Sequence, residues 1–224
     1  MPNSPRPPTH AAPVTDLGAE KARVRKAAFA ARKDAHAAGH AGASGVLSSV
    51  LAGYRGVPLA GYMPIRTEID PLPAMAEAAA HGPVAVPVIE GAGLPLRFSR
   101  WVPDGPLRDG PFGAQVPEVD DFLEPEIVIV PLVAFTATGG RLGYGGGFYD
   151  RTLEGLRARR ATLAIGFAFA AQQLDAVPLE ATDQPRDMTT TARGVTEPSW
   201  GRCPRDLRPP PRGIFGQKKT DRLP

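Results

Sequence analysis

The sequence predicts an α/β protein in which helices cover both faces of a mostly parallel central sheet, a three-layer sandwich. Two observations lead to this prediction. Short apolar runs resemble buried strands, and segments rich in good helix formers separate them. The predicted helices span 17–38, 44–54, 72–81 and 148–160, and the predicted strands span 59–63, 84–89, 94–101, 127–131 and 162–169.

Local signals support individual elements. The first helix is dense in Ala, Lys and Arg, and Gly39 offers a place for it to end. Pro87 indicates an end or an irregular position in the second predicted strand. In the last predicted strand, Gly166 marks a close approach of the backbone to a neighbour. We expect residues 103–125 to be mostly loop.

We expect one domain, residues 16–199, between a disordered N-terminal tail (1–15) and a disordered C-terminal tail (200–224). Residues 201–224 carry seven Lys or Arg and two Asp, a net charge of +5, which leaves 19 basic and 21 acidic residues in 1–200. The basic excess therefore lies in the tail and not on the domain. For this reason we do not expect nucleic acid as a partner.

Composition narrows the class of protein further. Hydrophobic residues make up 42% of the chain, enough for a packed core. No run approaches the ~18 apolar residues of a membrane span, and the first residues lack the apolar stretch of a signal peptide. Cys203 is the single cysteine, so neither an intrachain disulfide nor a cysteine-rich zinc site can form. We therefore expect a cytoplasmic monomer without a membrane partner.

Residues 141–151 carry the strongest functional signal. Four of the five residues in 143–147 are glycine, and this glycine loop stands between a predicted strand and a predicted helix. Such a turn can present bare backbone N–H groups and a helix N-terminus to an anion, which makes phosphate the first hypothesis. A purely structural turn is the alternative, because glycines serve in those as well.

Two other groups could contribute to a phosphate-handling site. Lys21 and Arg25 share a face of the first helix, where they could reach phosphates or simply be solvated; Arg32 lies two turns further on. Glu68 follows Tyr62 and Met63, and its carboxylate could grip the N–H groups of a heterocycle or cap a turn.

Two carboxylates suit a metal ion. Asp150 follows the glycine loop, and Asp183 comes after the next strand. Mg²⁺ typically takes one or two carboxylates together with phosphate oxygens and water, which fits this pair. Either residue could equally be a helix cap or a surface acid. No Ser-His-acid arrangement stands out, which agrees with chemistry that depends on phosphate, metal and positioning.

With these motifs in view, the chain is similar to the 5-formyltetrahydrofolate cyclo-ligase family over about residues 21–191. The most specific part is the string formed by residues 131–135 and 140–151. The supporting matches are Lys21-x-x-x-Arg25, Tyr62-x-Pro-x-x-x-Glu68-Ile-Asp70, Phe98-x-x-Trp101, Gly113-x-x-x-Pro117, Ile165-Gly-Phe167 with Gln172 or Gln173, and Asp183-x-Pro-x-Asp187.

The resemblance implies an ATP- and Mg²⁺-dependent enzyme. Its substrate would be 5-formyltetrahydrofolate, with or without a polyglutamate chain, and its products 5,10-methenyltetrahydrofolate, ADP and phosphate. The formyl oxygen would accept the γ-phosphoryl group, and N10 would then close the ring as phosphate leaves. A folate- or nucleotide-binding protein without turnover is the alternative.

The resemblance also implies roles for residues by position. Arg141 and Tyr149 would be catalytic, and Asp150 and Asp183 would hold Mg²⁺. Folate would contact Met63, Glu68, Tyr144, Gly145, Gly146, Gly147 and Phe148. ATP would contact Lys21, Arg25, Arg141, Leu142, Gly143, Tyr144, Gly145, Gly146, Gly147, Phe148 and Tyr149.

Several positions depart from the family pattern. Val116 stands where Glu is usual, and Arg186 where an apolar residue is usual. Thr189 and Thr190 replace an apolar pair, and Ala192 replaces an acid. Segment 186–192 is therefore more polar than the resemblance implies.

Overall fold

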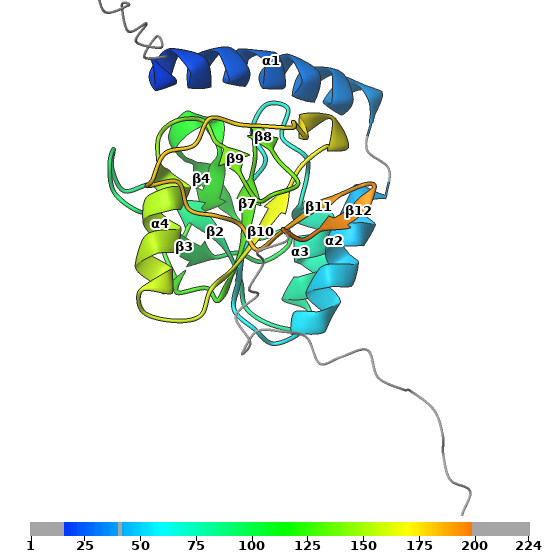
Figure 1. Ribbon diagram of the computed structural model, residues 1–224. Coiled ribbons are helices and arrows are strands. Elements are labelled where there is room, and N and C mark those ends of the chain that lie inside the picture. The colour runs from blue at the N-terminus through cyan, green and yellow to red at the C-terminus, as the bar shows by residue number, and fades with distance from the viewer. Residues whose placement is uncertain (1–15, 40–41, 199–224) are drawn as a thin grey trace, which may run out of the picture.

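The computed structural model describes residues 16–39 and 42–198. Its centre is an eight-stranded sheet in the order β12-β11-β10-β7-β1-β2-β3-β6 (Figure 1). The strands from β11 to β2 are parallel, while β12 pairs antiparallel with β11, β3 with β2, and β6 with β3. The two predicted tails, 1–15 and 200–224, lie outside the described residues.

The helices are α1 (Leu17–Ala38), α2 (Ala43–Leu51), α3 (Leu72–Ala79) and α4 (Phe148–Arg157), with 3₁₀ turns η1 (Ala52–Tyr54), η2 (Pro111–Gly113) and η3 (Ala170–Gln172). The strands of the large sheet are β1 (Leu59–Ala60), β2 (Val84–Val88), β3 (Arg97–Arg100), β6 (Phe122–Leu123), β7 (Ile127–Pro131), β10 (Leu163–Phe167), β11 (Met188–Thr191) and β12 (Gly194–Thr196). Two small hairpins consist of β4 (Leu107–Asp109) with β5 (Gln115–Pro117), and of β8 (Ala134–Phe135) with β9 (Arg141–Leu142).

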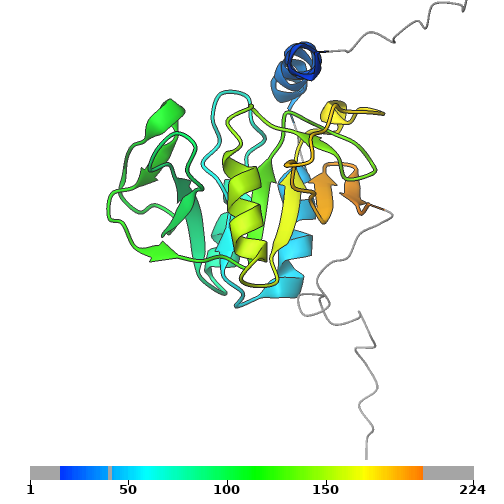
Figure 2. The same ribbon diagram turned by 60° about the vertical axis from the view of Figure 1, so that its left-hand side comes forward.

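Strand β7 shows why the sheet needs helices on both faces. Its side chains alternate, so Ile127 and Ile129 join the core under α2 and α3, while Val128 and Val130 join the core under α4. An uninterrupted apolar strand of this kind is stable only when both faces are covered. Figure 2 shows α4 on one side of the sheet and α2 on the other. The predicted α/β sandwich with a mostly parallel sheet is confirmed.

Helix α1 lies apart from these two layers. It crosses the molecule beyond the carboxyl ends of β7 and β10 (Figure 1), where Ala28 packs with Val133, Ala134 and Leu142 around the β8–β9 hairpin. Its bounds agree with the predicted ones, and Asp16 caps it by accepting from the amide of Gly18. Within residues 16–39 and 42–198, no helix is long and apolar enough to cross a membrane.

Two sequence predictions need correction. Residues 103–125 are not simply loop, since they contain β4, η2, β5 and β6. These strands have only two or three residues each, too few for an alternating pattern to be recognised. Strand β1 is shorter than the predicted 59–63, although the Gly61 amide still donates to the Ala85 carbonyl at 2.9 Å.

The polar segment 186–192 contains β11, and hydrogen bonds account for its buried threonines. Thr189, Thr190 and Thr191 are all buried. The Thr189 hydroxyl accepts from the Arg186 guanidinium, and the Thr190 hydroxyl donates to the Gly166 carbonyl at 3.3 Å. A Cβ at Gly166 would lie 2.7 Å from Arg186 Cδ, so the close approach predicted at this glycine is present and makes room for the arginine.

Candidate functional site

The glycine loop lies at the carboxyl edge of the parallel strands, the edge at which α/β proteins bind ligands. The chain leaves β7, forms the β8–β9 hairpin and passes through residues 143–147 into α4. Gly145 and Gly147 have φ angles of 101° and 64°, a region that favours glycine. Gly147 is also the N-cap of α4, and no side chain caps that end. The helix amides at this end therefore remain available to an anion.

Arg141 and Asp150 form an ion pair across the glycine loop. The Arg141 guanidinium comes from β9, before the loop, and donates to the Asp150 carboxylate in the first turn of α4. The backbone of Gln184 joins both residues, because its carbonyl accepts from Arg141 Nε at 2.9 Å and its amide donates to Asp150 Oδ1 at 2.8 Å. Segment 180–187 is thereby held against the loop.

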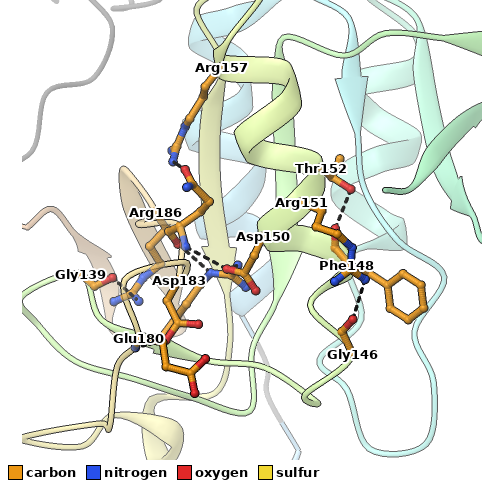
Figure 3. A network of polar contacts seen from close by, with 12 residues as sticks. Gly139, Gly146, Phe148, Asp150, Arg151, Thr152, Arg157, Glu180, Asp183 and Arg186 are labelled. Atoms are coloured by element: carbon orange, nitrogen blue, oxygen red, sulfur yellow. Dashed lines mark hydrogen bonds and ion pairs between the residues drawn. The ribbon is translucent and has the colours of Figure 1, made fainter. Parts of the chain in front are cut away.

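Lys21 and Asp183 form a second pair beside the first. Lys21 Nζ lies 2.9 Å from Asp183 Oδ2 and 3.4 Å from Glu180 Oε2, and Lys21 is buried. A purely solvated basic face on α1 is therefore the wrong interpretation for Lys21. The Gln184 amide donates to Asp150, and Gln184 directly follows Asp183. The two predicted metal carboxylates, Asp150 and Asp183, therefore lie on neighbouring segments (Figure 3).

Arg25 contacts the glycine loop itself. Its Nε donates to the Gly143 carbonyl at 2.8 Å, and a Cβ built at Gly145 would lie 3.3 Å from its Cζ. One helix thus brings Lys21 to the acidic segment and Arg25 to the loop. The positive charge of Arg25 therefore lies beside the loop whose backbone amides could bind an anion.

Glu68 contacts the loop through Tyr144. It is buried, and its carboxylate accepts from the Ile65 amide at 2.9 Å, so the predicted role in a turn is present. Burial raises the pKa of Glu68, while hydrogen bonds from the Ile65 amide and the Tyr144 hydroxyl oppose that shift. The contact with Tyr144 connects this carboxylate to the glycine loop. The Asp70 carboxylate, by contrast, accepts from the Leu72 amide at 2.8 Å, at the start of α3.

The hydroxyls of Tyr144, in the glycine loop, and of Tyr149, in the first turn of α4, stay protonated at neutral pH. Burial and the nearby Glu68 carboxylate raise the pKa of Tyr144 to about 12, and the same two causes raise the pKa of Tyr149 well above its ordinary value. Either hydroxyl can therefore donate a hydrogen bond to an oxygen but cannot supply a phenolate base. The neighbouring Phe148 ring packs edge-on against Phe112 at a centroid distance of 6.4 Å.

Sequence reasoning gave no role to two arginines that the structure places at the site. Arg32 is 2% exposed and donates to the Tyr144 hydroxyl at 2.7 Å. Arg186 is 1% exposed and donates to the carbonyls of Thr136 and Gly140 at 2.5 and 2.6 Å. The spacing of eleven residues between Lys21 and Arg32, which keeps both on one helix stripe, was the available signal for Arg32.

Arg186 holds the turn that precedes Arg141. Besides these two carbonyls it donates to the Gly139 carbonyl at 3.2 Å, and no carboxylate of the described segments forms an ion pair with it. Burial, with Arg141 nearby, lowers the pKa of Arg186 to about 10, so it stays charged at neutral pH. Gln172 supports the same region, since its Nε2 donates to the Val133 carbonyl at 3.0 Å.

The residues at the site suit Mg²⁺, which keeps water and phosphate ligands, better than a metal ion that is coordinated entirely by protein side chains. Across the described part of the chain there is no group of three or more His, Cys, Asp or Glu that could cage an ion. Asp150 and Asp183 supply two carboxylates beside an anion loop, the ligand number that Mg²⁺ uses when phosphate and water complete its shell.

A separate hollow lies at the opposite edge of the sheet. It is lined by residues of α2 and α3 and by the first residues of β1, β2 and β7, and its volume is about 20 Å³. That space suits a water molecule and not a nucleotide. We therefore place the candidate site at the glycine loop, where the charges converge.

Fold and site together define an α/β protein with an anion-binding loop, two carboxylates and a buried glutamate at one edge of its sheet. The model of the 5-formyltetrahydrofolate cyclo-ligase family matches residues 18–192, and the chain belongs to that family. Among curated relatives, the 5-formyltetrahydrofolate cyclo-ligase of Mycolicibacterium smegmatis is 30% identical over 175 residues, covering 73% of this chain and 89% of the relative. That of Haemophilus influenzae is 39% identical over 95 residues, covering 40% of this chain and only 50% of the relative.

Solved structures show the same fold. An NMR structure of Aquifex aeolicus 5,10-methenyltetrahydrofolate synthetase superposes with a TM-score of 0.67 at 25% identity, covering 90% of this chain and 99% of the other. A 5,10-methenyltetrahydrofolate synthetase from Mycoplasma pneumoniae gives a TM-score of 0.57 at 20% identity, covering 80% and 99%, and supports the fold alone.

Proposed function

We propose that this protein converts 5-formyltetrahydrofolate to 5,10-methenyltetrahydrofolate, using ATP and Mg²⁺ and releasing ADP and phosphate. One observation carries the proposal. The Arg141–Asp150 and Lys21–Asp183 pairs converge on an intact glycine loop in a chain of the cyclo-ligase family. The loop is then surrounded by the groups that we propose to bind phosphate, by the two proposed metal carboxylates and by the buried Glu68.

The nucleotide would lie along the glycine loop. Lys21 and Arg25 would bind its phosphates, Lys21 as a point charge and Arg25 as a fork, and the α4 amides would add donors. Residues 141–149 would surround the nucleotide, with Leu142 buried beneath it in the hairpin core. Because Lys21 and Arg25 are already held by contacts within the protein, each would exchange a contact when ATP binds.

Asp150 and Asp183 would hold Mg²⁺. The ion, when bound, supplies positive charge to the phosphate oxygens. Both carboxylates are held by protein donors, Asp150 by the Gln184 amide and Asp183 by the Glu180 amide at 2.7 Å. Those amides leave the second oxygen of each carboxylate for other partners and fix its direction.

The folate would lie between the glycine loop and residues 63–68. Glu68 would accept from pterin N–H groups, Met63 would be an apolar wall, and Tyr144, Gly145, Gly146, Gly147 and Phe148 would line the side shared with ATP. A buried acceptor of this kind strongly discriminates between ligands, because a ligand without the matching donors leaves it unpaired.

The reaction makes the formyl oxygen a good leaving group. That oxygen attacks the γ-phosphorus, the bond to the bridging oxygen of ADP breaks, and the positive charge is carried by N5 and the formyl carbon. N10 then attacks the same carbon, loses its proton, and the C–O bond breaks to release phosphate. Arg141 would stabilise the transferred phosphoryl group, and the protonated Tyr149 would donate to an oxygen that gains charge.

The direct test mixes purified protein with 5-formyltetrahydrofolate, ATP and Mg²⁺ and follows the near-ultraviolet absorbance of the methenyl product. We expect product only when both ATP and Mg²⁺ are present. Absence of product with retained folate binding would refute turnover and indicate a folate-binding protein.

A further inference from the structure

Helix α1 carries three cations on one stripe that faces the candidate site. Lys21, Arg25 and Arg32 are separated by four and seven residues, which places them within about 40° of one another around the helix axis. Lys21 pairs with Asp183, Arg25 with the Gly143 carbonyl, and Arg32 with the Tyr144 hydroxyl. The stripe therefore runs from the predicted metal carboxylate Asp183 to the Tyr144 side chain of the glycine loop.

Arg32 is the most buried of the three, with 2% of its surface exposed. Its Nε donates to Thr67 Oγ1 at 3.1 Å, and its Nη1 donates to the Tyr144 hydroxyl at 2.7 Å. Its Nη1 lies 4.0 Å from Glu68 Oε1. The guanidinium thus contacts the segment that bears Glu68 and, on its other side, the glycine loop.

Two aromatic rings pack against this guanidinium. Its Cζ lies 5.1 Å from the centre of the Phe29 ring and 5.3 Å from the centre of the Tyr144 ring, and those two rings are 5.3 Å apart. A planar fork packed against two rings keeps its direction better than a flexible ammonium group would. Movement of Tyr144 would therefore change the surroundings of Glu68 through Arg32.

We propose that Arg32 is a positioning residue that couples the nucleotide end of the glycine loop to the folate end of the site. Nucleotide binding along residues 143–147 would fix Tyr144, Tyr144 would fix the Arg32 fork, and the fork would orient Thr67 and Glu68 toward the folate. ATP and folate then bind more tightly together than singly, and by reciprocity each strengthens the other equally. This inference rests on the proposed function.

The test measures the dissociation constant of 5-formyltetrahydrofolate with and without a saturating, non-hydrolysable ATP analogue and Mg²⁺, by titration calorimetry. In the unaltered protein we expect the analogue to tighten folate binding by about fivefold or more. In R32M and R32K the ratio of the folate dissociation constants without and with the analogue should fall to near one. The affinity of these variants for the analogue alone should stay within about threefold of the unaltered protein. Lysine keeps the charge but cannot reach Thr67 and Tyr144 together.

Two further variants separate coupling from folding. Y144F keeps the partly exposed ring and loses only the hydroxyl, so it should fold, lose most of the coupling and add little to R32M in the double variant. R23M removes an exposed arginine from the same helix and should keep the full factor.

The outcomes also distinguish this inference from the function on which it rests. If the unaltered protein binds folate and the analogue with a factor near one, or if R32M and Y144F keep the full factor, the coupling role of Arg32 is refuted and the proposed function stands. If the unaltered protein binds no folate, both fail.

Discussion

Lys21 Nζ lies 2.9 Å from Asp183 Oδ2, which joins a cation proposed for phosphate to a carboxylate proposed for metal across 162 residues of sequence. Each partner neutralises the other in the absence of ligands. In the proposed complex with ATP and Mg²⁺, Lys21 would exchange the carboxylate for a phosphate and Asp183 would exchange the ammonium for the metal ion, so the charge of the site would stay balanced. We therefore expect the Lys21–Asp183 ion pair to be replaced by contacts with phosphate and Mg²⁺ in the proposed complex.

This exchange predicts the effect of D183N. The amide keeps the shape of the side chain but binds Mg²⁺ poorly, so the Mg²⁺ concentration needed for half-maximal turnover should rise on the order of tenfold or more. E180Q is the matched control, because Glu180 also lies near Lys21 but is not a proposed metal ligand. Equal Mg²⁺ requirements in the two variants would rule out Asp183 as a ligand.

Asp150 should matter more for turnover than for folding. D150N keeps an oxygen that can accept from the Gln184 amide, but it loses the charge that faces Arg141 and would bind the metal. We expect turnover to fall by about 10²-fold or more while the thermal unfolding midpoint changes by only a few degrees. The absorbance assay and a thermal melt measure the two effects, and unchanged activity would refute the assignment.

Arg186 should show the opposite pattern, with a large effect on folding. R186M removes the donor to the buried Gly139 carbonyl, and leaving such a group unsatisfied costs about 1–3 kcal/mol. The carbonyls of Thr136 and Gly140 lose the guanidinium but keep the amides of Gly139 and Thr136 as donors. R193M, at an exposed position on the turn between β11 and β12, should stay within about 0.5 kcal/mol of the unaltered protein. Urea unfolding measures both, and equal midpoints would show that the Arg186 contacts contribute nothing.

Glu68 gives a prediction about pH. Burial raises its pKa in the folded protein above the value in the unfolded chain. Its contribution to the free energy of unfolding is therefore complete below the unfolded pKa, about 4.3, and is lost as pH rises through the higher folded pKa. E68Q does not titrate, so its stability relative to the unaltered protein should increase with pH across that window.

Urea unfolding at several pH values, from mildly acidic to neutral, measures this difference. E77Q removes a carboxylate at an exposed position of α3 and controls for the loss of one charge. A stability difference between E68Q and the unaltered protein that stays constant or decreases with rising pH would contradict the raised pKa.

Local patterns were sufficient for the elements that meet at the site. The bounds of α1 and β7 could be predicted because helix formers with a terminal glycine, and an apolar run followed by Pro131, act within a few residues. The glycine loop could likewise be placed between a strand and a helix. Contacts formed only by tertiary packing could not be predicted in this way.

Arg186 and Arg32 illustrate that limit. At position 186 the family pattern favours an apolar residue, yet the absence of a side chain at Gly166 makes room for the arginine, and three carbonyls accept its hydrogen bonds. At position 32, helical spacing gives the direction of the side chain but not the Tyr144 hydroxyl that meets it. Both depend on residues twenty or more positions away in sequence.

The most direct measurement follows the formyl oxygen. With 5-formyltetrahydrofolate labelled with ¹⁸O in the formyl group, ATP and Mg²⁺, the protein should form the methenyl product and transfer the label to the released phosphate, one labelled oxygen for each product molecule. Product accompanied by unlabelled phosphate, or no product at all, would contradict phosphorylation of the formyl oxygen at this site.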